Sequence, residues 1–129
     1  MKTTATSVLI IGGGLTGLTL GYLLSKKGID FTIVEARETL GGRIRTKYND
    51  NKAPIELGAT WLVEQQTSAL ELLEELNISV FEQNYGSTAI YHPNGIKNAQ
   101  LVNLPKNDSK SFRIAGGTSM LINTLAKTL

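Results

Sequence analysis

The chain of 129 residues contains no cysteine and a single histidine. The absence of cysteine excludes disulfide bonds and thiolate metal sites, and it is compatible with the cytoplasmic location that we expect. The histidine, His92, stands next to Pro93 in a turn-like stretch. We therefore expect His92 to be a surface residue, and we expect neither a metal site nor a catalytic histidine.

The sequence also lacks a strong charge of either sign. The formal net charge is +2, and no basic stripe or aromatic platform is evident, so we expect no nucleic-acid partner. Residues 7–24 carry no charge, but five glycines lie between Gly12 and Gly21, which is poor material for a membrane-spanning helix. With 41% apolar and 19% charged residues, the composition is that of one ordinary globular domain.

The most informative stretch lies near the N-terminus. An apolar run, Val8–Ile11, leads into a glycine turn, a helical pattern extends to Lys27, and a second apolar run, Phe31–Val34, ends on Glu35. A dinucleotide-binding unit has this pattern: a strand, a glycine turn, a helix, a second strand and a terminal carboxylate within about thirty residues. We therefore expect an α/β fold with a Rossmann-like βαβ unit.

The glycine turn has a spacing that suits a pyrophosphate. Gly12 permits the tight turn, Gly14 lets the backbone approach the phosphates, and Gly17 lets the helix pack against the strand. The helix start offers free N–H groups and a partial positive charge. Glu35 follows Gly12 by 23 residues, where a carboxylate accepts hydrogen bonds from ribose hydroxyls and repels a 2′-phosphate. The simpler alternative is a glycine turn without a ligand.

The residues after the second strand indicate which dinucleotide binds. Glu35-Ala36-Arg37 is followed by Leu40-Gly41-Gly42-Arg43, which is unusual for a nicotinamide-dependent dehydrogenase. This stretch resembles the flavin-containing amine oxidase superfamily, which includes monoamine and polyamine oxidases, protoporphyrinogen oxidase and phytoene desaturases. The resemblance implies that these residues hold the ribose and phosphates of FAD. Arg43 can supply forked, charge-assisted bonds, although a solvated loop arginine is the simpler alternative.

Further segments extend the resemblance. Glu56-Leu57-Gly58-Ala59-Thr60-Trp61 is similar to the segment that these oxidases place along the flavin, and Trp61 corresponds to an aromatic position near the ring. An ordinary core tryptophan is the alternative. Residues 70–81 and 112–117 also match the family. The resemblance implies these cofactor-binding residues: Gly12, Gly13, Gly14, Leu15, Thr16, Gly17, Glu35, Ala36, Arg37, Gly42, Arg43, Gly58, Ala59, Thr60 and Trp61.

Two departures from the family limit what the resemblance implies. The stretch between Trp61 and Gly116 is short, and no residue matches the later parts of the family's flavin site. We therefore expect an incomplete domain: a cofactor-binding unit over 1–61, a small α+β substrate-side segment over 62–129, and the remainder of the FAD domain absent after 129. Such a piece should be inactive alone and should self-associate through an exposed sheet edge.

Periodicity predicts the remaining elements. Apolar spacing favours a helix over Thr67–Leu76 with Asn77 as its cap, and a last helix over Ser119–Leu129 with Thr118 as its N-cap. A hairpin is expected from 87–91, a turn at 92–95, and a strand from residue 96 onward. The polar stretch 98–110, which holds Pro105 and Asn107-Asp108, reads as a loop.

Three functions are compatible with these patterns. The resemblance implies hydride transfer from a C–H bond of a small amine, or a related compound, to flavin N5, with reoxidation by oxygen and with FAD supplying the chemistry. No catalytic residue is identified. The alternatives are a nicotinamide-dependent oxidoreductase that shares the Rossmann unit, and a non-catalytic module that binds a dinucleotide.

Overall fold

The computed structural model describes residues 6–84, 86–93, 98–105 and 109–129. Its first unit is β1 (Val8–Ile11), α1 (Leu15–Lys26) and β2 (Phe31–Val34), with the bounds that the sequence predicts for both strands. The two strands pair in parallel, which requires the helix to cross between them. Gly28, at φ +66°, follows the end of α1, where the left-handed backbone suits glycine.

A hairpin follows the βαβ unit. It consists of β3 (Thr46–Tyr48) and β4 (Pro54–Glu56), which pair antiparallel with Thr46 opposite Glu56. The turn at residues 49–53 is closed by the Asn49 side chain, whose Oδ1 accepts the Ala53 N–H at 2.8 Å. The sequence does not predict β3, because its three residues are too short for a recognisable pattern.

A second sheet has the order β5-β9-β6 and is antiparallel. Its strands are β5 (Leu62–Val63), β6 (Val80–Glu82) and β9 (Ser111–Ile114). The helix α2 (Thr67–Glu75) precedes β6, and Asn77 ends it at φ +54°, which confirms the predicted cap. The helix α3 (Ser119–Thr128) follows β9 through Gly116 and Gly117.

One expectation for α3 is wrong in its chemistry. Thr118 stands at the N-cap position, but its backbone is already helical, at φ −65° and ψ −25°, and its side chain makes no capping hydrogen bond. In that conformation the hydroxyl does not reach the free N–H groups of its own first turn. Two residues of the β3–β4 hairpin, Glu56 and Thr46, accept those N–H groups instead.

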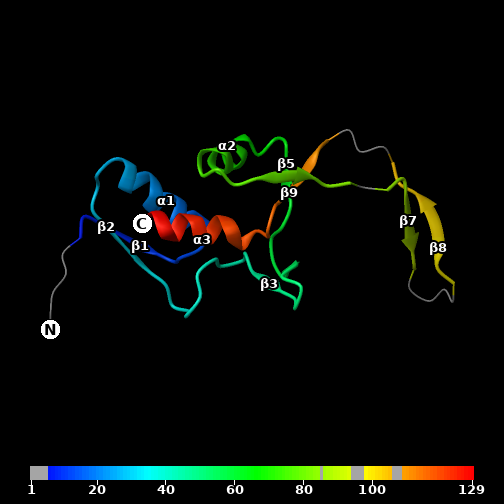
Figure 1. The fold of residues 1–129 in the computed structure, drawn as a ribbon, viewed down its shortest axis with the longest axis horizontal. Helices are drawn as coiled ribbons and strands as arrows, with labels where there is room; N and C mark the ends of the chain where they lie inside the picture. Colours follow the sequence, from blue (N-terminus) through cyan, green and yellow to red (C-terminus); the bar gives the residue numbers. More distant parts are fainter. Residues whose placement is uncertain (1–5, 85, 94–97, 106–108) are drawn as a thin grey trace.

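The polar stretch at 98–110 is not entirely a loop. The strands β7 (Thr88–Tyr91) and β8 (Gln100–Asn103) form an antiparallel hairpin, in which Ile90 lies opposite Leu101. The prediction of a loop there is therefore wrong for 100–103, because pairing with β7 satisfies the backbone of a segment with little strand pattern. The predicted turn at 94–95 and Asn107-Asp108 lie outside the described residues. Figure 1 shows this hairpin standing away from the helices.

The hydrophobic core lies where the three helices meet. Figure 1 shows α1 and α3 side by side, with α2 above them in the view. The core combines residues from both sides of the expected boundary at residue 61. The division of the chain into segments 1–61 and 62–129 stays a prediction. Its buried members are Leu18, Ile44, Leu73, Ile114, Leu121, Ile122 and Leu125.

The outer face of the β1–β2 pair is apolar and exposed. Its side chains Leu9 and Ile11 are 57% and 84% exposed, whereas Ile10, which faces α1, is buried. Parallel strands are normally covered on both faces, and their apolar runs reflect this. The described residues cover only the face that α1 packs against.

Candidate functional site

The glycine turn between β1 and α1 has the close approaches that the sequence predicts. Gly12 has φ +105°, and its N–H donates to the Val34 carbonyl at 2.7 Å. A Cβ atom on Gly17 would lie 2.0 Å from the Gly12 carbonyl oxygen, so only glycine lets the helix begin this close to the strand. A Cβ atom on Gly14 would meet nothing nearer than 3.8 Å. The fold therefore needs Gly17, whereas it does not need Gly14.

The first turn of α1 is free to bind an anion. No side chain caps it, and the N–H groups of Leu15 and Thr16 have no acceptor among the described residues. No acidic residue lies in that turn. Unpaired N–H groups and the positive end of the helix dipole attract a phosphate or carboxylate. This turn is therefore the anion-binding part of the candidate site.

Glu35 lies beside that turn and is held rigidly. Its Oε2 accepts the Gly13 N–H at 2.7 Å, and its Oε1 accepts the Arg37 N–H at 3.0 Å. These two N–H donors, that of Arg37 above all, lower the pKa of the Glu35 carboxyl below its ordinary value. The carboxylate is thus ionised near neutral pH, and each oxygen keeps a lone pair for a further donor.

The Gly-Gly-Arg turn packs directly against the glycine turn. Gly41 donates its N–H to the Gly13 carbonyl at 2.9 Å and forms a parallel bridge with Gly14. Gly41 and Gly42 have φ values of +113° and +61°, which L side chains rarely adopt. The turn leaves the Arg43 side chain exposed. Gly41 belongs to the turn that the resemblance assigns to the cofactor, but it is absent from the list of individual cofactor-binding residues.

The segment from Gly58 to Trp61 is attached to the same turn. The Ala59 N–H donates to the Arg43 carbonyl at 3.0 Å, and a Cβ atom on Gly58 would lie 2.1 Å from that carbonyl oxygen. Gly58 is therefore required by the backbone of residue 43, in addition to any contact with a ligand. Trp61 is 64% exposed, so the alternative of an ordinary core tryptophan is wrong.

The predicted residues come together, with two peripheral members. The bridge between residues 14 and 41 and the hydrogen bond between residues 43 and 59 join three segments: the glycine turn, the Gly-Gly-Arg turn and residues 58–61. Ala36 and Arg37 lie at the margin and are exposed. The Arg37 Nε lies 3.7 Å from Glu35 Oε1, so this guanidinium adds positive charge next to the carboxylate.

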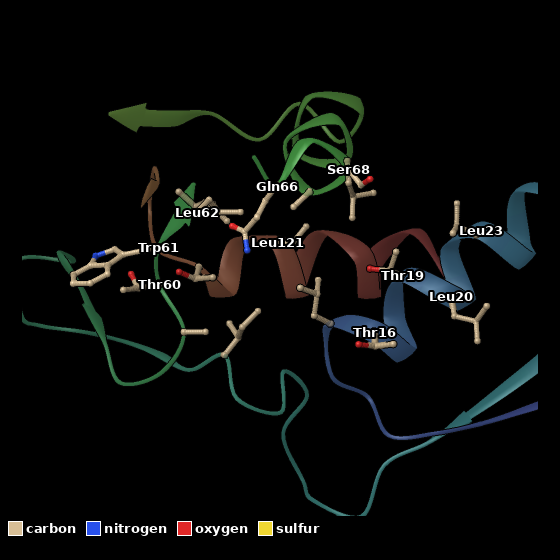
Figure 2. A pocket seen from close by; sticks show the side chains of 17 residues that line it. Thr16, Thr19, Leu20, Leu23, Thr60, Trp61, Leu62, Gln66, Ser68 and Leu121 are labelled. Atoms are coloured by element: carbon tan, nitrogen blue, oxygen red, sulfur yellow. The ribbon is translucent and has the colours of Figure 1, made fainter. Parts of the chain in front are cut away.

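An uncharged groove of about 590 Å³ begins at this cluster and follows α1. Figure 2 shows Trp61 at one end, Leu20 and Leu23 at the other, and Gln66 between them. The hydroxyls of Thr19 and Thr60 are buried in its wall without a partner among the described residues. Among the described residues, no ionisable side chain lines the groove, so they offer it no general acid or base. Its lining residues are Leu15, Thr16, Thr19, Leu20, Leu23, Ile44, Ala59, Thr60, Trp61, Leu62, Gln66, Ser68, Ala69, Leu72, Ile114, Thr118 and Leu121.

Within the described ranges, no three histidine, cysteine, aspartate or glutamate side chains come close enough to hold a metal ion together. None of the helices there has the length and apolar character that crossing a membrane requires.

Comparison with known proteins identifies the family. The model of the family of flavin-containing amine oxidoreductases matches residues 15–111, which is most of the chain. The chain belongs to this family. It is 33% identical over 88 residues to the flavin-containing amine oxidase B of Cavia porcellus, covering 68% of this chain. It is also 33% identical over 87 residues, 66% of this chain, to polyamine oxidase 5 of Oryza sativa subsp. japonica.

Solved structures agree with this assignment. A putrescine oxidase with bound putrescine superposes with a TM-score of 0.66 at 30% identity, covering 83% of this chain and 24% of that one. The cyclohexylamine oxidase of Brevibacterium oxydans gives a TM-score of 0.67 at 25% identity, over 79% and 22% of the two chains. The chain spans 17% of the length of amine oxidase B and 18% of that of polyamine oxidase 5. The family to which the chain belongs is thus one of flavin-dependent oxidoreductases.

Proposed function

We propose that the chain binds the adenosine and pyrophosphate end of FAD as part of an amine-oxidising flavoenzyme. The observation that carries this proposal is the open first turn of α1 next to an ionised carboxylate. The N–H groups of Leu15 and Thr16 suit a pyrophosphate, and Glu35 suits the hydroxyls of a ribose. Family membership supports the flavin as the dinucleotide.

The residues present fit this cofactor. A side chain at position 14 would find open space within the protein, so the protein itself gives no reason for a glycine there. A phosphate that lies against the backbone gives such a reason. The Arg43 side chain, which is exposed and has no partner among the described residues, belongs to the Gly-Gly-Arg turn that packs against the glycine turn. Its guanidinium would add charge-assisted hydrogen bonds to phosphate or ribose oxygens.

The ring end of FAD is assigned to Gly58–Trp61. Gly58, Ala59 and Thr60 present a small-residue surface, and Trp61 presents an exposed indole. When bound, FAD would accept a hydride from a C–H bond next to an amine and would be reoxidised by oxygen. The residues of this chain bind and orient the cofactor. Since Trp61 is largely open to water, we propose that residues 1–129 alone bind FAD without oxidising amines.

Two alternatives remain to be tested. A nicotinamide-dependent reductase would share the βαβ unit, but the Gly41–Arg43 turn packed on it favours the flavin. A non-catalytic dinucleotide module would bind FAD and never turn over, in any length of the chain. Titration of the purified protein with FAD and with NADH distinguishes a nicotinamide-dependent reductase from a flavin-binding protein. A colourless preparation that binds NADH but not FAD would reject our proposal.

The Gly14→Ala variant tests the proposed site itself. Position 14 has φ −81° and free space for a methyl group, so the free energy of unfolding should change by less than about 0.5 kcal/mol. The same methyl group would obstruct a pyrophosphate on the backbone, so the Kd for FAD should rise at least roughly tenfold, about 1.4 kcal/mol. Isothermal titration and chemical denaturation measure the two effects. Unchanged FAD affinity in the folded variant would place the phosphates elsewhere.

A further inference from the structure

The first turn of α3 is capped by residues that are far away in the sequence. Glu56 Oε1 accepts the Thr118 N–H at 2.6 Å and lies 3.2 Å from the Thr118 hydroxyl. Glu56 Oε2 accepts the Thr46 hydroxyl at 2.8 Å. Thr46 and Ser119 then exchange two hydrogen bonds, each of 2.9 Å, between the backbone N–H of one and the hydroxyl of the other.

The backbone allows this contact only because position 117 is a glycine. Gly117 has φ +98°, and a Cβ atom on it would lie 2.6 Å from Thr46 Cγ2 and 3.1 Å from Glu56 Oε1. Nearby, the Tyr48 hydroxyl donates to the Gly116 carbonyl at 3.0 Å. The β3–β4 hairpin and the start of α3 are thus joined by side-chain contacts from both strands.

This joint is continuous with the segment assigned to the flavin ring. Glu56 is the last residue of β4, and Gly58 follows two residues later. Between them, the Leu57 N–H donates to the Arg45 carbonyl at 2.8 Å. Thr118 lines the same groove as Ala59, Thr60 and Trp61. The carboxylate of residue 56 therefore ties the first turn of α3 to the start of the 58–61 segment.

We infer that Glu56 is a positioning residue that holds Gly58–Trp61 against α3 and so sets where the ring end of the cofactor lies. This inference rests on the proposed function for the role of that segment. Both carboxylate oxygens of Glu56 are engaged by threonines of this chain, so it acts through the backbone that follows it. It is not assigned any part in the chemistry.

The first test uses Trp61, which is the only tryptophan of the chain. Fluorescence anisotropy and acrylamide quenching of Trp61 report how firmly the 58–61 segment is held. In Glu56→Ala, anisotropy should fall and quenching should rise. In Glu56→Gln both should stay near wild type, because the amide oxygen still accepts the Thr118 N–H and the amide N–H can donate to Thr46. Glu56→Asp should resemble alanine, because it is one methylene too short.

A matched control is Glu71→Ala, an exposed glutamate on α2. It should leave both signals of Trp61 unchanged. If Glu56→Ala does not fold, as circular dichroism would show, Ser119→Ala replaces it, since this change removes only the hydroxyl that accepts the Thr46 N–H. Ser119→Ala should lower the anisotropy by a smaller amount. Wild-type anisotropy in folded Glu56→Ala, or in folded Ser119→Ala when the former is unfolded, would overturn the inference.

The second test separates the two ends of the cofactor. FAD and ADP share the adenosine and phosphates, but only FAD reaches the ring end. In Glu56→Ala the Kd for FAD should rise roughly tenfold, the size of effect that losing a helix cap has on stability, and the Kd for ADP should not change. An equal loss for both ligands would mean a general loss of structure and would also overturn the inference. Wild-type protein that binds neither ligand would reject the proposed function instead, and Trp61 would then decide the positioning role alone.

Discussion

The helices α1 and α3 both follow consecutive glycines, 12–14 and 116–117, but the N–H groups of their first turns have different partners. In α1 the N–H groups of that turn have no acceptor among the described residues. In α3 the corresponding groups are accepted by Glu56 and Thr46 of a distant hairpin. A helix N-terminus attracts an anion in either case, and the difference is that α3 already has a carboxylate of its own chain.

The carboxylate near α1 is arranged differently. Glu35 accepts N–H groups from Gly13 and Arg37, which lie outside the first turn of the helix. It therefore stabilises the glycine turn and leaves the helix end open. The glycine turn at residues 12–17, before α1, is thus a candidate ligand site, and we call it the open turn. The glycine turn at residues 116–117, before α3, fixes a helix to a hairpin, and we call it the closed turn. Four predictions test this difference, and they are ordered from the largest expected effect to the smallest.

The largest effect is expected for Gly17→Ala in the open turn. The added Cβ would lie 2.0 Å from the Gly12 carbonyl oxygen and 3.2 Å from Ile10 Cγ2. Because a backbone atom cannot move aside cheaply, we expect the free energy of unfolding to fall by about 3 kcal/mol or more. Chemical denaturation measures this change. A stable Gly17→Ala protein would show that the helix and strand do not need this close approach.

Gly117→Ala in the closed turn should have a smaller effect. Its Cβ would meet side-chain atoms of Thr46 and Pro54, at 2.6 and 2.9 Å, and these can shift more easily than a carbonyl group. The backbone strain at φ +98° adds to the cost, so we expect a loss of about 2 kcal/mol. The free energy of unfolding is measured in the same way. If Gly117→Ala lowers it as much as Gly17→Ala does, a clash with side-chain atoms costs as much here as a clash with a backbone carbonyl.

The third prediction concerns pH and Glu35. Its N–H partners lower its pKa in the folded protein, so its contribution is present above the unfolded pKa and is lost as pH falls through the folded pKa. The stability difference between wild type and Glu35→Gln should therefore shrink as pH falls below about 4. Glu38→Gln, at an exposed neighbour, is the control. If the stability difference between wild type and Glu35→Gln does not depend on pH, an ionised Glu35 carboxylate does not stabilise the open turn.

The smallest effect on stability is expected for a change in β1, the strand that leads into the open turn. The strand β1, which leads into it, exposes Leu9 and Ile11, whereas β9, which leads into the closed turn, lies between two strands with Ser111 and Ile114 buried. We propose that the bare face of β1 causes self-association. Ile11→Lys should reduce the apparent mass in light scattering and change stability by less than about 0.5 kcal/mol. Wild-type protein that is already monomeric would contradict this proposal.

Much of the βαβ unit was predictable because its signals are local. These signals are the apolar runs of β1 and β2 and the spacing of Gly12, Gly14 and Gly17, and each acts over a few neighbouring residues. The prediction that these residues and Glu35 form one unit needed only the known geometry of a parallel crossover. Resemblance alone implied that the Gly41-Gly42-Arg43 turn binds the same cofactor, and its packing against the glycine turn was not predicted.

What was missed depends on distant partners. The sequence predicts the hairpin of β7 and β8, with its second strand from residue 96 onward, but it also predicts a loop over 98–110. No strong local pattern places β8 at 100–103, because its position depends on pairing with β7. The strand β3 is recognisable only through its pairing with β4. Glu56 was noticed as part of a family segment without any role, because nothing in its neighbourhood shows that Thr118, 62 residues later, needs an acceptor.

By itself the sequence determined that two glycine turns each start a helix, since glycine spacing and apolar periodicity are properties of neighbouring residues. It also determined that a carboxylate stands 22 residues after Gly13. Only the tertiary structure decided which helix end stays open. The first N–H groups of any helix need an acceptor, and the fold brings Glu56 to α3 while it leaves the first turn of α1 without an acceptor among the described residues.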